Sequence, residues 1–438
     1  MTSVAQLVTA ADSEIAQRQA AGELKRAGLR SGDRVALLAN SSPAFIAVVL
    51  GALRTGIIPV LLHANLLVKE QESLLANSEP AKVLRGEEVE AMVGGELEVE
   101  LAPWPLARPM LYTSGTTGTP KGVYSGLLNE SDAANLLAEE REMWGFVASD
   151  IHLVASPLYH SAPMRFTAGT LLAGGSVLLP GRFDAPTFAA AIEQYQPTSA
   201  FVVPAHLQRL AALAELPSLG GFRLIAHAGA PCPQALKRRW LSLLPDGALW
   251  EFYGSTEGQV TACSPHDWLE RPGTVGRARQ GRVVSTDVDG MIWCGVPEYA
   301  RFEYWRDAER TSAAWRDSAF TVGDIGRLDT EQFLYLDGRR DDLVISGGVN
   351  VYPLEVERVL LEHPSVSDAA VFGVDDEQWG QRVCAVVVGD IDAESLMAWM
   401  REQVAPYKRP KEILVMEEIP VNSMGKVRRS DLASHINA

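Results

Sequence analysis

The segment of this chain best suited to bind phosphate is Leu111–Val123, LYTSGTTGTPKGV, which is rich in glycine and in hydroxyl side chains. Glycine lets backbone N–H groups approach an anion closely, and hydroxyl groups add further hydrogen-bond donors. Lys121 adds a positive charge. The segment predicts a polyphosphate-binding loop, with a plain polar turn as the alternative. Its expected ligand residues are Thr113, Ser114, Gly115, Thr116, Thr117, Gly118 and Lys121.

This loop differs from the Walker A loop of P-loop NTPases. A Walker A loop has glycine immediately before its lysine and serine or threonine immediately after it. Here Pro120 and Gly122 stand at those two positions. Pro120 would also interrupt the helix that such a loop opens. The sequence therefore disfavours a P-loop NTPase.

The elements that must position the loop alternate between short apolar runs and helical patterns. Apolar runs at 34–38 and 57–62 predict buried strands, and Ser41 or Ser42 can cap a helix that has Pro43 in its first turn. The same alternation returns between residues 150 and 254. This pattern predicts an α/β fold whose parallel sheets are covered by helices on both faces.

The character of the chain changes near residue 338. The charged segment GRRDD (338–342) predicts a hinge between an N-terminal region, 1–337, and a C-terminal domain, 343–438. In the C-terminal domain, we expect a helix at 353–364, two strands, and an amphipathic helix with Leu396, Met400 and Val404 on one face. About a hundred residues is a usual domain size, so we expect a separate α+β domain here.

Composition and charge restrict the class of protein. The 438 residues include 39 Lys and Arg and 55 Asp and Glu, a formal charge of −16, which argues against a nucleic-acid-binding surface. Four widely separated cysteines favour a reducing compartment. The N-terminus lacks the features of a signal peptide, and Arg54 lies inside the most apolar stretch, 44–62. We expect a cytoplasmic protein without an integral membrane segment.

The phosphate loop resembles the signature of the adenylate-forming superfamily, which includes acyl-CoA synthetases, peptide-synthetase adenylation domains and firefly luciferases. Five further segments resemble other motifs of that family in the family's order, so the similarity extends from about residue 24 to residue 432. It implies a large N-terminal region of stacked α/β subdomains and a small, mobile α+β C-terminal domain. The five segments are AHAGAP (226–231), YGSTEG (253–258), VGDIG (322–326), GRRDDLVISGGVNVYPLEVE (338–357) and VNSMGKVRR (421–429).

The resemblance implies a site in which a carboxylate attacks the α-phosphate of ATP. Glu257 and Thr116 would hold Mg²⁺, which prefers oxygen ligands. Asp324 would accept hydrogen bonds from the ribose hydroxyls, with Arg339 as a further donor. Tyr253 would contact adenine, and a buried core tyrosine is the rival interpretation. The remaining nucleotide contacts that the resemblance implies are Gly229, Ala230, Pro231, Gly254, Ser255 and Thr256.

The C-terminal domain would supply further groups, again by resemblance. Lys426 would bridge the carboxylate and the α-phosphate, whereas an exposed lysine in a basic run is the ordinary alternative. Gly347 and Gly348 would line a channel for CoA. Asp341 falls at the family's hinge position, and Asn350 matches a polar position of the mobile domain.

The acyl pocket is expected around His160, in the segment PLYHSAPM (157–164), together with Ala228 and Gly229. His160 is equally compatible with gating this pocket and with a structural role. Amino-acid-activating relatives place an aspartate in this segment to pair with the substrate ammonium group, and none is present here. An α-amino acid is therefore disfavoured, because burying an unpaired ammonium group is costly.

The function implied is that of an ATP-dependent acyl-CoA synthetase. It would convert a fatty or other apolar carboxylic acid into an acyl adenylate and then an acyl-CoA, releasing pyrophosphate and AMP. The alternatives are an acyl-AMP ligase that delivers to a carrier protein and a nucleotide-binding relative without catalysis. The expected partners are ATP, CoA and the acid, with Mg²⁺ as cofactor and a homodimer as one candidate assembly.

Overall fold

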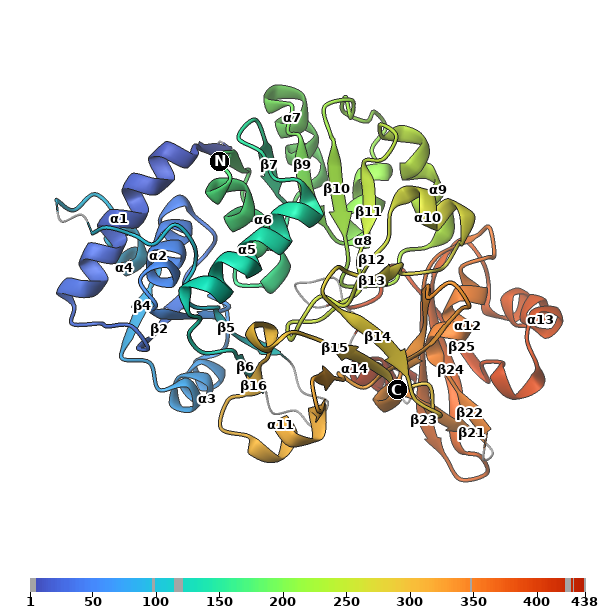
Figure 1. Cartoon of the computed structure of the whole chain (residues 1–438). Coiled ribbons are helices and arrows are strands. Elements are labelled where there is room, and N and C mark those ends of the chain that lie inside the picture. Colours follow the sequence, from blue (N-terminus) through green and yellow to red (C-terminus); the bar gives the residue numbers. More distant parts are fainter. Residues whose placement is uncertain are drawn as a thin grey trace.

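The structure is a computed structural model, and it describes residues 5–96, 99–113, 121–346, 349–421, 427 and 429–436. A six-stranded sheet organises the first part of the chain (Figure 1). Its strands, in spatial order, are β16 (Glu303–Tyr304), β6 (Lys121–Tyr124), β5 (Met110–Thr113), β3 (Ile58–Leu62), β2 (Arg34–Leu38) and β4 (Lys82–Arg85). The four strands from β5 to β4 are parallel, and β6 and β16 are antiparallel additions. The strands expected at 34–38 and 57–62 are therefore confirmed.

A second six-stranded sheet follows, and its strands from β8 to β11 are also parallel. The antiparallel edge strand β1 pairs with β8. The spatial order is β1 (Gln6–Val8), β8 (Ser176–Leu179), β7 (Ile151–Val154), β9 (Ser199–Val202), β10 (Leu224–His227) and β11 (Leu249–Glu251). Parallel strands joined by helices confirm the α/β prediction for the N-terminal region.

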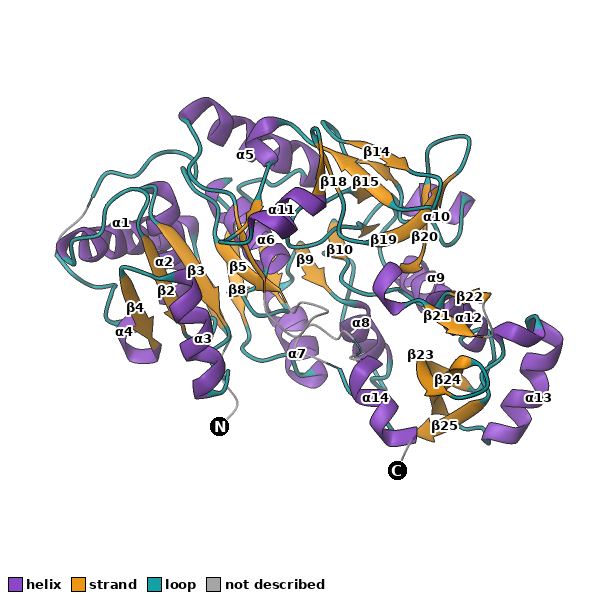
Figure 2. Cartoon of the chain, turned by 90° about the horizontal axis from the view of Figure 1, so that it is seen from below, coloured by secondary structure: helices purple, strands orange, loops and turns teal. Residues whose placement is uncertain are grey.

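Helices cover both faces of the first sheet. In Figure 2, α1 (Ala10–Arg26) and α2 (Pro43–Arg54) lie on one side of β2 and β3, and α3 (Val68–Ser78) lies on the other. The Ser42 hydroxyl caps α2 by accepting a hydrogen bond from Phe45 N, as expected, and every residue of α2 after Pro43 is buried. The other helices of this region are α4 (Gly86–Glu90), α5 (Glu130–Trp144), α6 (Ser161–Leu172), α7 (Ala185–Tyr195), α8 (Pro204–Ala211), α9 (Gln234–Leu243), α10 (Pro265–Glu270) and α11 (Ala308–Ala314).

Short antiparallel strands connect these sheets to the end of the N-terminal region. They form one four-stranded sheet and two two-stranded sheets. The four-stranded sheet comprises β14 (Val283–Thr286), β15 (Ile292–Gly295), β18 (Ala319–Phe320) and β17 (Trp315–Arg316). The two-stranded sheets are β12 (Thr261–Ala262) with β13 (Arg277–Ala278), and the hairpin of β19 (Asp324–Leu328) with β20 (Leu334–Arg339).

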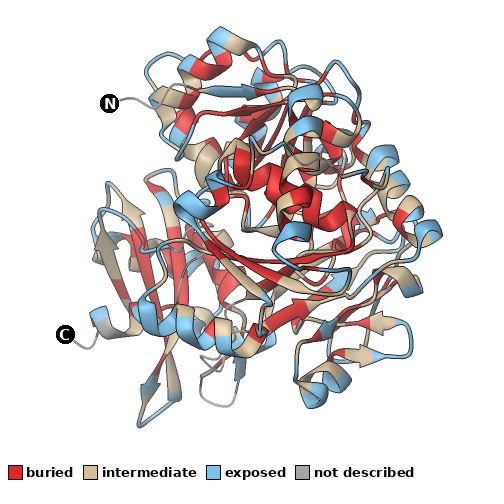
Figure 3. Ribbon diagram, turned by 90° about the vertical axis from the view of Figure 1, so that its left-hand side faces the viewer, coloured by how far each residue is buried: buried red, intermediate tan, exposed pale blue. Residues whose placement is uncertain are grey.

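The C-terminal residues form their own sheet, which shares no described strand with the others. Buried residues concentrate in this sheet and at the centre of the N-terminal region (Figure 3). The strands are β21 (Val344–Ser346), β22 (Val349–Val351), β23 (Val366–Asp376), β24 (Gly380–Gly389) and β25 (Glu412–Met416), and the helices are α12 (Pro353–Leu360), α13 (Ala393–Gln403) and α14 (Arg429–Ile436). The α+β character is confirmed.

Two details of this domain differ from the sequence-based expectation. The helix expected at 353–364 ends at Leu360, where tighter turn hydrogen bonds replace the helical pattern, as in the bond from His363 N to Leu360 O. Helix α13 buries Leu396 and Met400 but ends before Val404, which caps it and is only half-buried.

Arg54, the charged residue inside the apolar stretch 44–62, is buried but has an ion-pair partner. The Arg54 side chain is 7% exposed and forms an ion pair with Glu14. Arg54 Nη1 also donates a hydrogen bond of 2.8 Å to Gln17 Oε1. Among the described residues, no helix is long and apolar enough to cross a membrane.

Candidate active site

Asp324 and Arg339 face each other across the β19–β20 hairpin as a cross-strand pair. Arg339 Nε lies 3.1 Å from Asp324 Oδ1. On the other side, Asp324 Oδ2 accepts a hydrogen bond of 2.6 Å from the Tyr253 hydroxyl. Three residues predicted for the nucleotide site, each from a different sequence motif, are therefore in direct contact.

Burial controls the electrostatics of this group. Tyr253 is 9% exposed and Asp324 is 8% exposed. Burial and the Asp324 carboxylate raise the pKa of the Tyr253 hydroxyl, which therefore stays a hydrogen-bond donor. Burial alone would lower the pKa of Arg339, but Asp324 and Asp342 raise it. Asp324 Oδ1 is buried and contacts the Arg339 guanidinium, but it has no hydrogen-bond partner among the described atoms. A buried carboxylate oxygen normally has one, which fits the ribose contact predicted for Asp324.

Glu257 is held by a tyrosine that the sequence analysis missed. The Tyr304 hydroxyl donates a hydrogen bond of 2.8 Å to Glu257 Oε1, and both residues are buried. Lys121 Nζ lies 5.1 Å from the centre of the Tyr304 ring, because β16 pairs with β6. Glu257 therefore lies beside the strand that follows the predicted phosphate loop. Tyr304 is 47 residues from Glu257 in the chain, and no local pattern marks this contact.

The position of Glu257 fits a magnesium ligand. Among the described side chains, only Tyr304 hydrogen-bonds to its carboxylate, which leaves Oε2 without a described hydrogen bond. Burial and the Glu257 carboxylate raise the pKa of the Tyr304 hydroxyl, so this group remains a donor to the carboxylate. Mg²⁺ is usually held by one or two carboxylates together with phosphate oxygens, and a buried glutamate beside a phosphate loop suits that role.

A tight turn places Glu257 near the β19–β20 hairpin. Gly254 and Gln259 form an isolated β-bridge across the turn. A Cβ atom on Gly254 would lie 2.7 Å from Gln259 Cα, so the turn requires glycine. A Cβ atom on Gly258 would lie 3.1 Å from the Phe320 ring, which shows that the turn packs closely against the segment leading to β19.

The predicted acyl-pocket segment follows β10 at the carboxyl edge of the second sheet. Ala228 is buried, Ala230 is half-buried, and Gly229 and Pro231 are exposed. Gly229 adopts a φ of +92°, a conformation that favours glycine. Ala228 belongs to a buried cluster whose aromatic members are Trp144, Phe146, Phe166, Phe201 and Phe252. These rings fill the space between the sheet and helices α5 and α6.

His160 caps the N-terminus of α6, and no described contact joins it to the nucleotide group. Its ring centre lies 4.4 Å from that of Tyr159, which in turn lies 4.7 Å from that of His63. Burial and the nearby His63 lower the pKa of His160 to about 4, so its imidazole is neutral at neutral pH. Its Nε2 atom is buried and has no hydrogen-bond partner among the described atoms. The gating role of His160 stays a prediction.

Several predicted site residues lie outside the described residues: Ser114, Gly115, Thr116, Thr117, Gly118, Gly347, Gly348 and Lys426. The residues that border these segments are paired. Thr113 pairs with Lys121, Ser346 with Val349, and Val421 with Val427. The roles that the resemblance implies for the residues between them stay predictions.

The other predicted residues lie in or near these segments. Ser255 and Thr256 are half-buried in the turn that carries Glu257. Asp341 is exposed in the short 3-10 helix η2 (Arg340–Asp342), and Asn350 is exposed in β22. Burial raises the pKa of the Cys232 thiol to about 12, so this thiol is poorly suited to act as a nucleophile.

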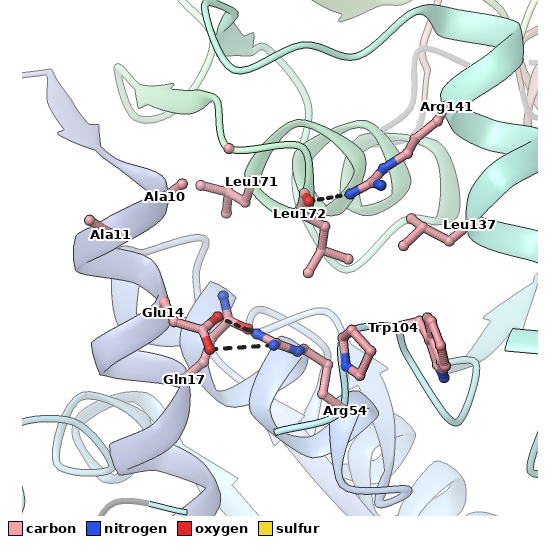
Figure 4. Close-up of a pocket in the computed structure, with 12 residues that line it drawn as sticks. Ala10, Ala11, Glu14, Gln17, Arg54, Trp104, Leu137, Arg141, Leu171 and Leu172 are labelled. Carbon is pink, nitrogen blue, oxygen red and sulfur yellow. Dashed lines mark hydrogen bonds and ion pairs between the residues drawn. The ribbon is translucent and has the colours of Figure 1, made fainter. Parts of the chain in front are cut away.

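A cavity of about 610 Å³ lies elsewhere, between α1, α2, α5 and α6 (Figure 4). Its lining includes the Glu14–Arg54 pair, Arg141 and the Leu171–Leu172 segment. None of the residues predicted to contact ATP, Mg²⁺ or the acid is among its lining residues. This cavity is therefore separate from the candidate active site.

The chain matches two family models. The description "AMP-binding enzyme" applies to residues 4–102 and 98–292, and "AMP-binding enzyme C-terminal domain" applies to residues 355–426. Two relatives are each 32% identical to this chain. The 2-succinylbenzoate–CoA ligase of Bacillus licheniformis aligns over 95% of this chain and 92% of its own length. The feruloyl-CoA synthase of an Amycolatopsis species aligns over 96% and 92%, respectively.

A solved structure shows the same architecture. The o-succinylbenzoate CoA synthetase of Bacillus subtilis, in complex with its acyl-adenylate intermediate, superposes with a TM-score of 0.82. It is 28% identical to this chain and covers 98% of it, with 93% of its own length matched. This chain belongs to the AMP-binding enzyme family, in the acyl-CoA synthetase branch of the adenylate-forming superfamily.

Proposed function

We propose that this protein is an ATP-dependent carboxylic acid–CoA ligase that works through an acyl adenylate. The observation that carries the proposal is the convergence of Tyr253, Asp324 and Arg339, with Glu257 in the same turn as Tyr253. This group offers one carboxylate for the ribose and a second for a metal bound to phosphate. Relatives named as CoA ligases support CoA as the acceptor.

In the first half-reaction, the substrate carboxylate attacks the α-phosphate of ATP and pyrophosphate leaves. Because two anions must meet, the protein has to supply positive charge and fixed donors at the reacting atoms. Lys121 and Lys426 would supply that charge, and Asp324 would orient the nucleotide through its ribose. Mg²⁺, when bound by Glu257 and Thr116, would neutralise charge on the phosphates.

In the second half-reaction, the CoA thiol attacks the acyl carbon and AMP leaves. We infer that Gly347 and Gly348 border the path of the thiol and that residues 338–342 form the hinge. Strand β20 of the N-terminal region ends at Arg339, and β21 of the separate C-terminal sheet begins at Val344, which supports this division. The four free thiols support a reducing, cytoplasmic setting.

The acid is proposed to be compact and ring-sized rather than a long fatty chain. A long chain would need an apolar channel, whereas the described space behind Ala228 is filled by packed aromatic rings. The ring centres of Trp144 and Phe166, for example, are 4.9 Å apart. The relatives named for 2-succinylbenzoate and ferulate, both aromatic acids, also support a ring-containing substrate.

The test is ATP-dependent pyrophosphate release with a panel of aromatic, short aliphatic and long-chain acids, followed by mass spectrometry of the CoA products. We expect AMP and acyl-CoA in equal amounts with a compact acid. Pyrophosphate release without CoA consumption, together with acyl transfer to a carrier protein, would favour the acyl-AMP ligase. ATP binding without pyrophosphate release for any acid would indicate a non-catalytic relative.

A further inference from the structure

Gln259 lies buried at the base of the turn that carries Glu257. It is 4% exposed, and its β-bridge with Gly254 closes this turn. Inside the turn, Ser255 N donates a hydrogen bond of 2.9 Å to Gly258 O. Because the turn is this short, the position of Gln259 determines where the residues between it and Gly254 lie.

The side-chain amide of Gln259 has a partner for each of its two donor and two acceptor positions. Arg165 Nη2 donates a hydrogen bond of 2.6 Å to Gln259 Oε1, and Arg279 Nη1 donates a longer one of 3.5 Å to the same oxygen. Gln259 Nε2 donates hydrogen bonds of 3.2 Å to Thr261 O and 3.1 Å to Met143 Sδ. Arginine can only donate, so the atom that faces the two guanidinium groups must be the amide oxygen.

The arginines that hold Gln259 are themselves anchored. Arg165 on α6 and Arg279, which follows β13, pair with the two oxygens of Glu140 on α5, at 3.0 and 2.9 Å. Ion pairs that are also hydrogen bonds hold their members in a defined geometry. Aromatic side chains of α5 and α6 pack against β9 and β10 of the second sheet. Gln259 is therefore tied to two helices that have a fixed place on that sheet.

The same turn is held at a second point, through Glu257 itself. The Tyr304 hydroxyl, on β16 of the first sheet, donates a hydrogen bond of 2.8 Å to Glu257 Oε1. The turn is thus fixed between the two sheets, by Tyr304 on one side and by Gln259 on the other. Mg²⁺ requires near-octahedral geometry with oxygens at about 2.0–2.1 Å, so its ligands must be placed closely. Losing either restraint would leave Glu257 held at one point only.

We propose that Gln259 is a positioning residue for the metal site: through Arg165 it fixes the turn that presents Glu257 to a Mg²⁺ ion bound to the phosphates of ATP. This inference rests on the proposed function and deepens it. Gln259 is not itself a ligand of the metal, because its amide oxygen already faces two arginines. It acts on the metal only through the position of Glu257.

The test measures how much Mg²⁺ tightens the binding of β,γ-methylene-ATP, by isothermal titration calorimetry of the full chain in EDTA and in saturating Mg²⁺. The readout is the ratio of the two dissociation constants, which does not depend on turnover. Gln259→Leu removes the hydrogen bonds at similar volume and should lower this ratio by about threefold or more. The dissociation constant in EDTA should stay at the wild-type value, because the proposed adenine and ribose contacts are Tyr253 and Asp324.

Further variants separate positioning from stability. Arg165→Met should also lower the ratio, because it removes the 2.6 Å hydrogen bond to Gln259. Gln259→Glu keeps an oxygen for the arginines but loses both donors, so its ratio should lie between those of Gln259→Leu and the wild type.

Arg282→Met is the matched control. The Arg282 side chain is 5% exposed and pairs with Glu139 at 2.9 Å, and its described hydrogen bonds go to Glu139 and Gly281 rather than to Gln259. Breaking this buried pair should lower the free energy of unfolding but leave the ratio unchanged.

Three results would overturn the inference. One is a folded Gln259→Leu variant with the wild-type ratio, and another is an equal fall in Gln259→Leu and Arg282→Met, which would trace the effect to lost stability. The third is a parallel loss of binding in EDTA, which would show that the whole nucleotide site is disturbed. If Gln259→Leu does not fold, Arg165→Met decides by the same criteria.

Two outcomes with the wild-type protein are distinct from these. If the analogue does not bind at all, the proposed function is refuted and this inference with it. If it binds equally well with and without Mg²⁺, the metal role of Glu257 and the positioning role of Gln259 are both refuted, while the ligase assignment is still decided by pyrophosphate release.

Discussion

Arg429 Nη1 donates a hydrogen bond of 2.9 Å to Asp342 Oδ2, and the Nη2 atom of the same guanidinium donates one of 2.7 Å to Glu357 Oε1. Asp342 ends the 338–342 segment, and Glu357 is buried in α12. Arg429 begins α14, three residues after Lys426. One side chain therefore links the proposed hinge, the core of the C-terminal domain and the helix that follows the predicted catalytic lysine.

Replacing Arg429 should destabilise the C-terminal domain. Arg429→Met leaves the buried Glu357 carboxylate without its cation, and breaking a buried pair costs about 3–5 kcal/mol. Asp342→Asn removes only a half-exposed partner, so its cost should stay below about 1 kcal/mol. Hydrogen exchange of the α12 and α14 amides would measure both effects. Equal losses in the two variants would show that Glu357 does not depend on Arg429.

The contact between Tyr253 and Asp324 should control the affinity for ATP. Asp324→Ala removes a charged acceptor for ribose hydroxyls, which is worth about 1.5–3 kcal/mol, and should raise the KM for ATP by at least tenfold. Tyr253→Phe removes only the 2.6 Å hydrogen bond that orients Asp324, so a smaller rise is expected. The two effects should be less than additive in the double variant, because Tyr253 acts through Asp324. A KM for ATP equal to that of the wild type in Asp324→Ala would contradict the ribose assignment.

Glu257 and Tyr304 should control the requirement for magnesium. Glu257→Gln removes the charge proposed to hold Mg²⁺, and should shift the Mg²⁺ titration of pyrophosphate release to higher concentration and lower its maximum. Tyr304→Phe keeps the carboxylate but removes its 2.8 Å hydrogen bond, so the same shift should be smaller. Arg301→Met changes an arginine near Tyr304 in the sequence and serves as the control. Superimposable Mg²⁺ titrations for the wild type and Glu257→Gln would exclude the metal role.

The buried ion pairs of Glu140 with Arg165 and Arg279 should make the free energy of unfolding depend on pH below about 5. Burial alone would raise the pKa of Glu140, but Arg165 and Arg279 lower it to about 2. A carboxylate whose pKa is lowered in the folded state stabilises it above its unfolded-state pKa, and this contribution is lost as the pH falls toward the folded-state pKa. The contribution is about 3 kcal/mol at neutral pH.

Urea unfolding at several pH values between 6 and 3 would measure this effect. Glu140→Gln should be less stable than the wild type at pH 6, and the difference should shrink on acidification as the wild type loses the charge of Glu140. A constant difference across the range would show that Glu140 does not titrate with a lowered pKa.

The strands and helices of the parallel sheets were predictable because their local signals agree with the fold. The apolar run of β2 and the Ser42 cap before Pro43 both appear in the sequence at the positions that the structure uses. The two-residue strands β16 and β18 carry no such signal, since strands this short have no periodicity to read. Their pairing is set by the surrounding sheets.

The candidate site likewise contains some residues that the sequence predicts and others that it does not. Asp324, Glu257 and Tyr253 stand in recognisable motifs, so their roles could be predicted before their contacts were seen. The contact of Tyr304 with Glu257 and the ion pairs of buried arginines with the glutamates of α5 could not be predicted. An isolated tyrosine or arginine is ordinarily part of the core or the surface. Residues 108, 165, 279 and 282 lie near one another only after folding brings three separate segments of the chain together.

If the C-terminal domain alternates between two orientations, variants in it should affect one half-reaction and spare the other. If one domain serves both steps, it must present different faces to one site by turning about residues 338–342. Lys426 would then be needed only for adenylation, and Gly348 only for thioester formation. Lys426→Ala should therefore abolish acyl-adenylate formation from acid and ATP, yet still convert supplied acyl adenylate and CoA into acyl-CoA.

Two further variants should show the opposite pattern. Gly348→Leu should block thioester formation and spare adenylation, because its side chain would obstruct the proposed path of the thiol. Asp341→Pro should also spare adenylation selectively, because proline fixes φ at the hinge. Each half-reaction is measured separately for all three variants, with Glu402→Gln as a control on the exposed side of α13 that should affect neither step. Equal loss of both half-reactions in a folded Lys426→Ala variant would show that the domain does not alternate as proposed.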